Sequence, residues 1–279
     1  MKRLENTSHS SKGFTLVELV VCMVILGIIS TVVLAFLSNG TKFFVETSAR
    51  TEISVLGRNL SLRLERHLAN ALPYSYDVSS DKKSIDFLEV VGAYRVQKVQ
   101  KVQKVQKDVA PNEYIVSFFA STNTPFTKMR DRCLAYGIKD DDYRLYPAIF
   151  SRGDEVVKGQ PLTLKDSTLT WNKGDSLLSF KTTLDYKSLS EGARIYFLDS
   201  CSSIRYSQNS EVLKYQVFKY DPTSSTNEEI GNYDLTGTPV KLKELRFSGG
   251  STAVSFGFLL MNQDQSMPVS QYVEVTNAP

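Results

Sequence analysis

Several kinds of catalytic site are missing from this sequence. Its 279 residues include two histidines, one tryptophan and three cysteines. The glycine-rich phosphate-binding motifs GxGxxG and GxxxxGK[ST] do not occur, and neither does a nucleophile-elbow pattern. Histidine is too scarce for the usual zinc sites, which combine several histidines or cysteines. The sequence therefore predicts no enzyme, no cofactor, no metal site and no small-molecule substrate.

Charge is missing from one long stretch near the N-terminus. From Leu19 to Leu37 no side chain among 19 consecutive residues is charged. At about 1.5 Å per residue this stretch makes about 28 Å of helix, close to the hydrocarbon thickness of a bilayer. Lys2, Arg3 and Lys12 precede it, and basic residues favour the cytoplasmic side of a membrane. Residues 14–37 are thus predicted to cross the inner membrane once, with the C-terminal part in the periplasm.

One carboxylate, Glu18, lies at the start of this apolar segment. A secretory signal would have an apolar core of about 7–15 residues followed by a small-residue cleavage site. Here the core is longer, and the small residue Gly13 precedes it. A plain signal anchor explains the length but not Glu18, because a carboxylate costs about 2.5–3.5 kcal/mol near the centre of a membrane helix. Glu18 is therefore predicted to have a functional partner.

The residues around Glu18 carry a resemblance to a known superfamily. Lys12–Leu19 (KGFTLVEL) resembles the processing site of type IV pilins and type II secretion pseudopilins. The resemblance implies that a prepilin peptidase removes residues 1–13 by cutting after Gly13, and that Phe14 becomes an N-methylated terminus. It also implies that Glu18 pairs with the terminal amine of a neighbouring subunit in a filament. An ion pair is consistent with a carboxylate in apolar surroundings.

Removal of the leader would change the charge and the histidine content. The leader carries a net charge of about +2 out of +3, so a processed chain would be close to neutral and no nucleic-acid partner is expected. His9 would leave with the leader. His67 would then be the last histidine, and its place beside Leu68 indicates an ordinary helix-packing residue.

Beyond the membrane segment, residues 38–72 are predicted to continue the same helix as an amphipathic one. Ser38-Asn39-Gly40 is a possible point of loosening. Apolar residues then recur every three or four positions, which is the stripe of a helix that packs on one face. Leu72-Pro73 should end the helix, since the residue before proline avoids the helical region. A continuous helix over residues 14–72 would be about 88 Å long. The stripe consists of Ile53, Leu56, Leu60, Leu64, Leu68 and Ala71.

Residues 73–279 are predicted to form a β-rich globular domain. Short apolar runs are bounded by Gly, Pro, Asn, Asp and Ser clusters, and no second long helical pattern intervenes. The fold class is therefore α+β, pilin-like, with a long N-terminal helix packed on an antiparallel head. A hairpin is expected around Ser207–Ser210. The predicted strands are 84–91, 113–120, 193–198, 202–206, 212–220, 252–260 and 271–275.

Three cysteines divide between the two parts of the chain. Cys22 lies in the apolar segment and is interpreted as a small apolar residue. Cys133 and Cys201 would be exported to an oxidising compartment, where they form a disulfide or remain as two buried thiols. A disulfide would close a loop of 69 residues, worth about 4 kcal/mol in the chain-entropy model.

Two polar segments of the head have uncertain roles. Val96–Lys107 repeats Val-Gln-Lys four times, and a period of three fits neither a helix nor a regular strand. It is either a basic contact surface or a tandem duplication that lengthens an exposed strand or loop. Asp140, Asp141 and Asp142 could bind Ca²⁺, but their spacing is not that of an EF-hand, and a solvated acidic turn is preferred.

Within this superfamily, four later segments of the chain resemble minor pilins. Arg58–Ser75, Ile85–Val90, Ile195–Tyr206 and Tyr272–Pro279 resemble the O-type minor pilin of mannose-sensitive haemagglutinin (MSHA) pili. This implies a subunit that initiates, caps or assembles a type IV pilus, whose partners are the prepilin peptidase/methyltransferase, other pilins and the inner membrane, until it joins the extracellular pilus. One alternative is a J-type pseudopilin at the tip of a type II secretion pseudopilus. A second is a membrane-anchored periplasmic binding or sensor domain.

Overall fold

The protein is described from a computed structural model of the whole chain. The described residues are 15–101, 114–119, 127–139, 141–150, 156–158, 162, 169–172, 176–182, 193–222, 224, 228–250 and 253–275. Within them the chain divides into two compact units, residues 1–51 and 52–279.

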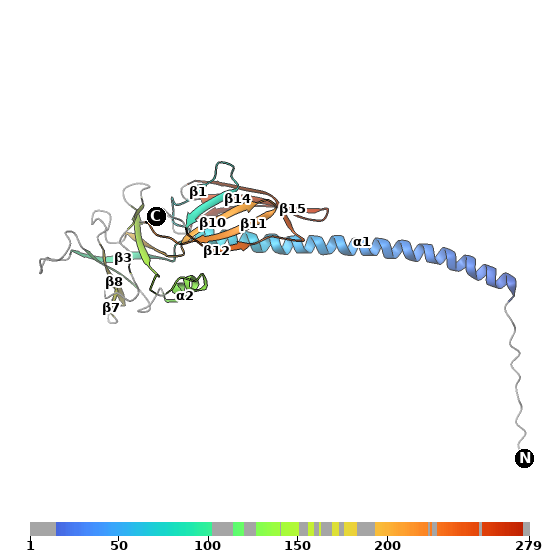
Figure 1. Cartoon of the computed structure of the whole chain (residues 1–279), viewed down its shortest axis with the longest axis horizontal. Coiled ribbons are helices and arrows are strands. Elements are labelled where there is room, and N and C mark those ends of the chain that lie inside the picture. Colours follow the sequence, from blue (N-terminus) through green and yellow to red (C-terminus); the bar gives the residue numbers. More distant parts are fainter. Residues whose placement is uncertain are drawn as a thin grey trace, which may run out of the picture. The chain divides into compact units, whose positions relative to one another are not determined.

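A single helix, α1 (Leu16–Ala69), dominates the N-terminal part of the chain (Figure 1). The predicted loosening at Ser38-Asn39-Gly40 is wrong, because helical hydrogen bonding continues through these residues. Thr41 Oγ1 donates to the carbonyls of Leu37 and Ser38, at 3.0 and 2.9 Å. The helix ends three residues before the predicted Leu72. There the backbone leaves the helix for the sheet, since Ala71 bridges Glu89 and Leu72 N donates to Leu88 O at 2.6 Å.

The second unit contains three sheets in which all described strand pairs are antiparallel, which confirms the predicted α+β class. The first sheet has the order β1-β2-β10-β11-β12, the second β13-β14-β15, and the third β6-β5-β9-β3-β4-β8-β7. One further helix, α2 (Thr127–Ala135), is short. The strands are β1 (Asp77–Val78), β2 (Ser84–Leu88), β3 (Gly92–Lys101), β4 (Tyr114–Phe119), β5 (Leu145–Phe150), β6 (Val156–Lys158), β7 (Leu169–Asn172), β8 (Leu177–Thr182), β9 (Arg194–Asp199), β10 (Ser203–Asn209), β11 (Val212–Phe218), β12 (Glu229–Asp234), β13 (Lys241–Gly249), β14 (Ala253–Asn262) and β15 (Gln265–Glu274).

All seven predicted strands correspond to strands of the structure, although β2 ends three residues earlier than predicted and β15 begins six residues earlier. The hairpin β10–β11 is present, but β10 extends to Asn209 and the turn is the shorter Ser210-Glu211. Ser210 adopts φ 54°, a left-handed conformation that suits a two-residue turn. Prediction missed α2 and several strands, including β3 and β13, in which charged and apolar residues are mixed, and β5, which is apolar but contains a proline.

The described half of the Val-Gln-Lys repeat, Val96–Lys101, belongs to β3 and pairs with β4. A register irregularity between Val96 and Lys98 adds a residue to β3. A bulge shifts the alternation of faces by one position, so two valines three residues apart can face the same side. Val96 is buried and Val99 packs against the same core. The three-residue spacing of Val96 and Val99 therefore fits a strand with one bulge between them. Residues 102–107 lie outside the described part.

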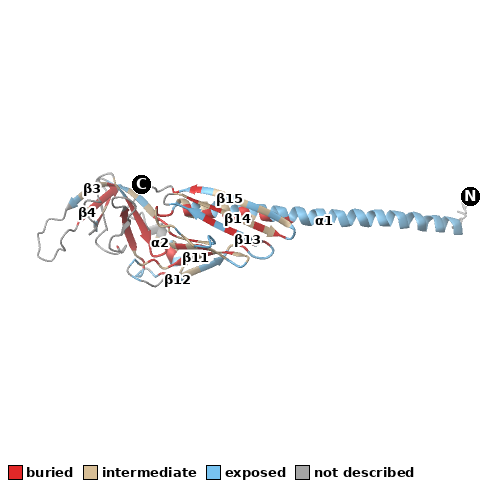
Figure 2. Ribbon diagram, turned by 90° about the horizontal axis from the view of Figure 1, so that it is seen from above, coloured by how far each residue is buried: buried red, intermediate tan, exposed pale blue. Residues whose placement is uncertain are grey.

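The core of the second unit joins the C-terminal part of α1 to the sheets. Ile53, Leu60, Leu64 and Leu68 are buried together with apolar residues of the strands, and Leu56 is partly buried against them. The predicted stripe is therefore the face of α1 that packs on the β-rich head (Figure 2). Gly57 allows a close approach, since a Cβ there would lie 3.4–3.5 Å from side-chain atoms of Val269, Leu260 and Met267.

Candidate functional site

The first turn of α1 shows how the sequence around Glu18 begins a helix. Thr15 lies just before the first helical residue, and its Oγ1 accepts a hydrogen bond from Glu18 N at 3.3 Å. This is the N-cap arrangement, with a glutamate at the third helical position as in a capping box. A negative charge in the first turn also interacts favourably with the helix dipole. The N-cap and the helix dipole thus explain why a glutamate is favourable at this position of the first turn. Among the described residues, the carboxylate of Glu18 has no protein partner.

The apolar segment of α1 exposes large hydrophobic residues in all directions. Those between Leu16 and Val45 are 44–81 % exposed within the chain itself (Figure 2). Within the described residues, α1 is the one helix that is long and apolar enough to cross a membrane. A helix that is hydrophobic all round must be covered by lipid or by other helices. Cys22 is among its exposed residues, as a free thiol.

The hydroxyl groups of this segment are satisfied within the helix. Ser30 Oγ donates to Leu26 O at 2.7 Å, and Thr31 Oγ1 donates to Ile28 O at 2.8 Å. Such bonds to the preceding turn remove the need for an outside partner, which matters in hydrocarbon. The segment therefore presents no unpaired hydroxyl at these two positions to lipid or to a neighbouring helix.

The second half of α1 brings His67 into a buried ionic cluster, which we call the head cluster: His67, Glu89, Arg132 and Asp199. His67 Nδ1 lies 2.9 Å from Glu89 Oε1, and Arg132 Nη1 lies 2.5 Å from Glu89 Oε2. Arg132 Nη2 also donates to Asp199 Oδ1 at 3.2 Å. The side chains of Glu89 and Asp199 are 8 % and 0 % exposed. His67 also packs against the rings of Tyr206 and Tyr215, so the predicted helix-packing residue additionally links α1 to a charged group of the head.

The two carboxylates of the head cluster respond differently to burial. Burial raises the pKa of Glu89, but the hydrogen bond with His67 and the charge of Arg132 outweigh it, so the net pKa is below the usual value. At Asp199 burial dominates and raises the pKa, although Arg132 and hydrogen bonds from Cys201 N and Ser202 Oγ partly offset it. Arg132 remains charged, since its pKa is raised by both carboxylates despite burial.

A disulfide adjoins this cluster. Cys133, the residue after Arg132 in α2, is bonded to Cys201, with a Cα–Cα distance of 5.8 Å. Cys133, Asp199 and Cys201 are also the one ligand-type group close enough together to hold a metal among the described residues. The disulfide uses both thiolates, so this group does not offer the ligands that zinc requires. Asp141 and Asp142 are exposed, and Asp140 lies outside the described part.

Sequence reasoning missed the head cluster although one signal for it was present. Ile85, Phe87 and Glu89 have the same parity along β2 and its extension, and all three are buried. A carboxylate on the core-facing side of a strand must have a partner. The partners Arg132 and Asp199 flank the two cysteines in sequence, so the disulfide and the cluster occupy the same region. The remaining predicted site residues, Gly13 and Phe14, lie outside the described part.

Comparison with known proteins gives one match. The family described as the prokaryotic N-terminal methylation motif matches residues 8–34. No curated protein and no solved structure matches the chain significantly. The matched range includes Gly13, Phe14, Glu18 and most of the apolar segment. Together with a long apolar helix and an antiparallel β-rich head, the motif supports a type IV pilin-like protein. The motif implies processing by a prepilin peptidase and assembly with other pilins.

Proposed function

We propose that this chain is a minor pilin, a structural subunit that initiates, caps or assembles a type IV pilus of the MSHA kind. The observation that carries the proposal is the methylation motif at residues 8–34, in register with Glu18 and with the uncharged segment behind it. The motif suggests a structural subunit rather than an enzyme. The resemblance of four head segments to the O-type minor pilin of MSHA pili supports the finer assignment.

In this proposal the chain starts as a single-pass inner-membrane protein with its β-rich head in the periplasm. Cleavage after Gly13 frees the amine of Phe14, which is then methylated. The helix leaves the bilayer and packs against the helices of other pilins, which cover its exposed apolar residues. Glu18, whose carboxylate has no partner within the described part of the chain, pairs with the terminal amine of a neighbour. That pair sets the axial register of the subunit.

A test compares Glu18→Val with Glu46→Val, which removes an exposed carboxylate farther along the same helix. Both variants should be processed and inserted into the membrane, because neither changes Gly13 or Phe14, the two residues joined by the bond that is cut. Glu18→Val should be incorporated at less than about a tenth of the normal level, which corresponds to losing an interaction of about 1.4 kcal/mol or more. Incorporation is measured by quantifying the subunit in sheared pili. Normal incorporation of Glu18→Val would refute the register role.

The alternatives make different predictions about the N-terminus and the partners. A membrane-anchored binding or sensor domain would keep Met1, and mass spectrometry would find no chain that begins with methylated Phe14. A J-type pseudopilin at the tip of a type II secretion pseudopilus would be processed in the same way. It would co-purify with pseudopilins after crosslinking, whereas a minor pilin should co-purify with pilus subunits.

A further inference from the structure

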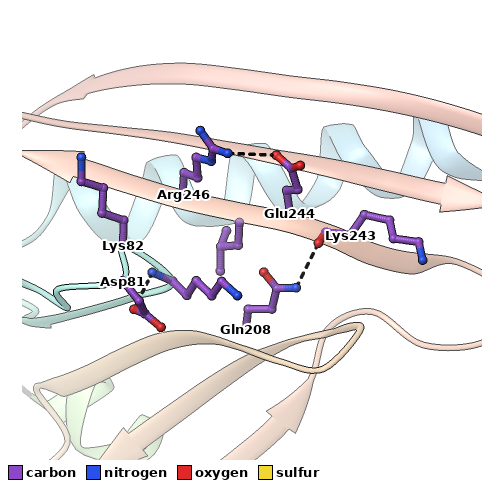
Figure 3. Close-up of a pocket in the computed structure, with 8 residues that line it drawn as sticks. Asp81, Lys82, Gln208, Lys243, Glu244 and Arg246 are labelled. Atoms are coloured by element: carbon purple, nitrogen blue, oxygen red, sulfur yellow. Dashed lines mark hydrogen bonds and ion pairs between the residues drawn. The ribbon is translucent and has the colours of Figure 1, made fainter.

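A cationic pocket lies in the head, among residues that the proposed pilus role does not use. It has a volume of about 410 Å³ and opens between the turn that precedes β2, the end of β10 and the middle of β13 (Figure 3). Four basic side chains and two carboxylates are among its lining residues, which are Asp81, Lys82, Lys83, Gln208, Lys243, Glu244, Leu245 and Arg246. Its volume is within the usual range for small-ligand sites.

The backbone holds the two lysines of the turn in place from both sides. Phe247 N of β13 donates to Lys82 O at 2.8 Å, and Gln208 N of β10 donates to Lys83 O at 3.0 Å. Within the turn, Lys83 N donates to Asp81 Oδ1 at 3.0 Å. The pocket is thus built by backbone hydrogen bonds to two different sheets.

Lys82 has a left-handed backbone conformation, with φ 60°. This region is strained for a residue with a side chain, and glycine would adopt it without cost. Strained conformations of this kind persist where the surrounding structure enforces them, and they are concentrated at binding sites. Ser210 and Gln263 have the same conformation in their turns, so at Lys82 it fixes the shape of the turn and does not by itself assign a use to the side chain.

The charges of the pocket are only partly neutralised. Lys243 lies 3.1 Å from Glu211, and Arg246 lies 3.6 Å from Glu244. The carboxylate of Asp81 accepts hydrogen bonds from Ser79 Oγ and from the turn backbone, which lower its pKa. Among the described residues, the ammonium groups of Lys82 and Lys83 have no carboxylate within 4.0 Å. Among the described lining residues, positive side chains thus outnumber carboxylates by four to two, although Asp81 attracts Lys83 electrostatically.

Gln208 contributes to the pocket lining a hydrogen-bond acceptor that has no donor in the described structure. Its Nε2 donates to Ser210 O at 2.8 Å and to Lys243 O at 3.2 Å, and because both partners are carbonyls, the orientation of the amide is fixed. Its Oε1 is buried and accepts no hydrogen bond in the described structure. Gln208 continues the inward-facing row of Ile204 and Tyr206 along β10. A buried acceptor of this kind requires a donor, such as a hydroxyl group.

We propose that this pocket binds a phosphate or sulfate group whose carrier also presents a hydroxyl donor, such as a sugar phosphate. The oxyanion would lie between the ammonium groups of Lys82 and Lys83, with Arg246 at the edge. The hydroxyl group would donate to Gln208 Oε1. Charge-assisted hydrogen bonds to a phosphate group are the strong kind. The proposal does not depend on the assembly role, since all lining residues lie in the second unit.

The test uses the full processed chain in detergent and three probes at constant ionic strength: glucose 6-phosphate, inorganic phosphate and glucose. Calorimetric titration should show binding in the order glucose 6-phosphate, inorganic phosphate, glucose. Gln208→Met removes the unsatisfied acceptor at similar volume and should abolish the advantage of glucose 6-phosphate over inorganic phosphate. To learn whether the group is free or carried by a lipid, vesicles that contain a phosphorylated glycolipid are compared with neutral phosphatidylcholine vesicles.

The variants separate binding from folding. Lys82→Gly should relieve the backbone strain and raise the unfolding temperature, yet it should weaken phosphate binding about tenfold or more. The matched control Lys214→Ala removes one positive charge from β11 outside the pocket and should leave the affinity within twofold of the original, since distant sites act independently. The proposal would be overturned if the control lost as much phosphate affinity as Lys82→Gly, or if neither phosphate probe bound. It would also be overturned if an acidic peptide bound more tightly than glucose 6-phosphate. None of these outcomes bears on pilus incorporation.

Discussion

The two parts of α1 on either side of Thr51 have the same secondary structure, but their apolar residues are distributed differently around the helix. Before Thr51, large hydrophobic side chains are exposed on all sides of the helix. After it, most of them form one buried stripe, while Val55 and Leu62 are exposed among the polar residues of the other sides. A helix covered by its own domain needs only a stripe, whereas a helix covered by lipid or by other subunits needs apolar residues all round. The distribution of apolar residues therefore separates the part of α1 that stabilises the head from the part that must find partners elsewhere.

Glu18 and Glu89 differ in the same way, one being exposed and the other buried. Glu18 is exposed, and its carboxylate has no protein partner in the described chain, whereas Glu89 is buried between His67 and Arg132. A buried carboxylate without partners would be strongly destabilising, so Glu89 is satisfied within the fold. Glu18 becomes a buried charge only when the apolar helix is covered. Under the proposed function, its need for a partner therefore arises when lipid or other helices cover α1, and not when the head folds.

The largest effect on the head is expected from Arg132→Met, which leaves Glu89 and Asp199 buried without their common cation. Breaking a buried ion pair in this way costs about 3–5 kcal/mol of unfolding free energy. Urea unfolding followed by near-ultraviolet circular dichroism measures the loss. The control Arg246→Met removes an exposed arginine paired with Glu244 and should change the unfolding free energy by less than about 1 kcal/mol. A small loss for Arg132→Met would show that the head cluster does not hold the head together.

A comparable but smaller loss is expected from Leu64→Ala in the buried stripe. Leu64 is fully buried against the sheets, so truncation should lower the unfolding free energy of the head by about 2–5 kcal/mol. Val24→Ala, in the exposed apolar part of α1, should leave the unfolding of the head unchanged in the same urea experiment. If both variants lost the same stability, the contrast between the two parts of α1 would be wrong.

The pH dependence should distinguish the two carboxylates of the head cluster. The lowered pKa of Glu89 means that its contribution to stability is present above about pH 4.3, its unfolded value, and is lost as pH falls through the folded value. Asp199 has a raised pKa, so its ionisation opposes folding as pH rises above about 3.9. Glu89→Gln should therefore lose more stability at pH 7 than Asp199→Asn. This difference should shrink as pH falls below about 4, which unfolding curves between pH 3 and 7 would measure. A difference that grew on acidification would contradict the assigned directions.

Sequence patterns predicted the parts of this fold that depend on local periodicity. The stripe from Ile53 to Leu68 and the apolar strands were recognisable because one face of each is buried. The strand β3 was not, because a bulge at Val96–Lys98 changes its alternation and only the pairing with β4 reveals it. The head cluster joins residues from α1, the end of β2, α2 and β9, and no short sequence window contains two of these partners. The left-handed Lys82 was equally hidden, since the hydrogen bond from Phe247 to its carbonyl comes from a distant strand.

The smallest predicted effect compares two glycines of α1, one on each side of Thr51. Around Gly40 a Cβ would meet nothing within 4 Å, whereas at Gly57 it would lie 3.4–3.5 Å from three side chains of the second sheet. Replacing a helical glycine by alanine favours the helix by about 0.5–1 kcal/mol when space permits. Gly40→Ala should therefore slow amide hydrogen exchange around residue 40 by about two- to fivefold in detergent. At Gly57 the added Cβ would make ordinary van der Waals contacts, so Gly57→Ala should raise the head's unfolding free energy by about 0.5–1 kcal/mol in urea unfolding. A loss of stability at Gly57 would mean that the buried stripe packs against the second sheet too tightly to accept a methyl group.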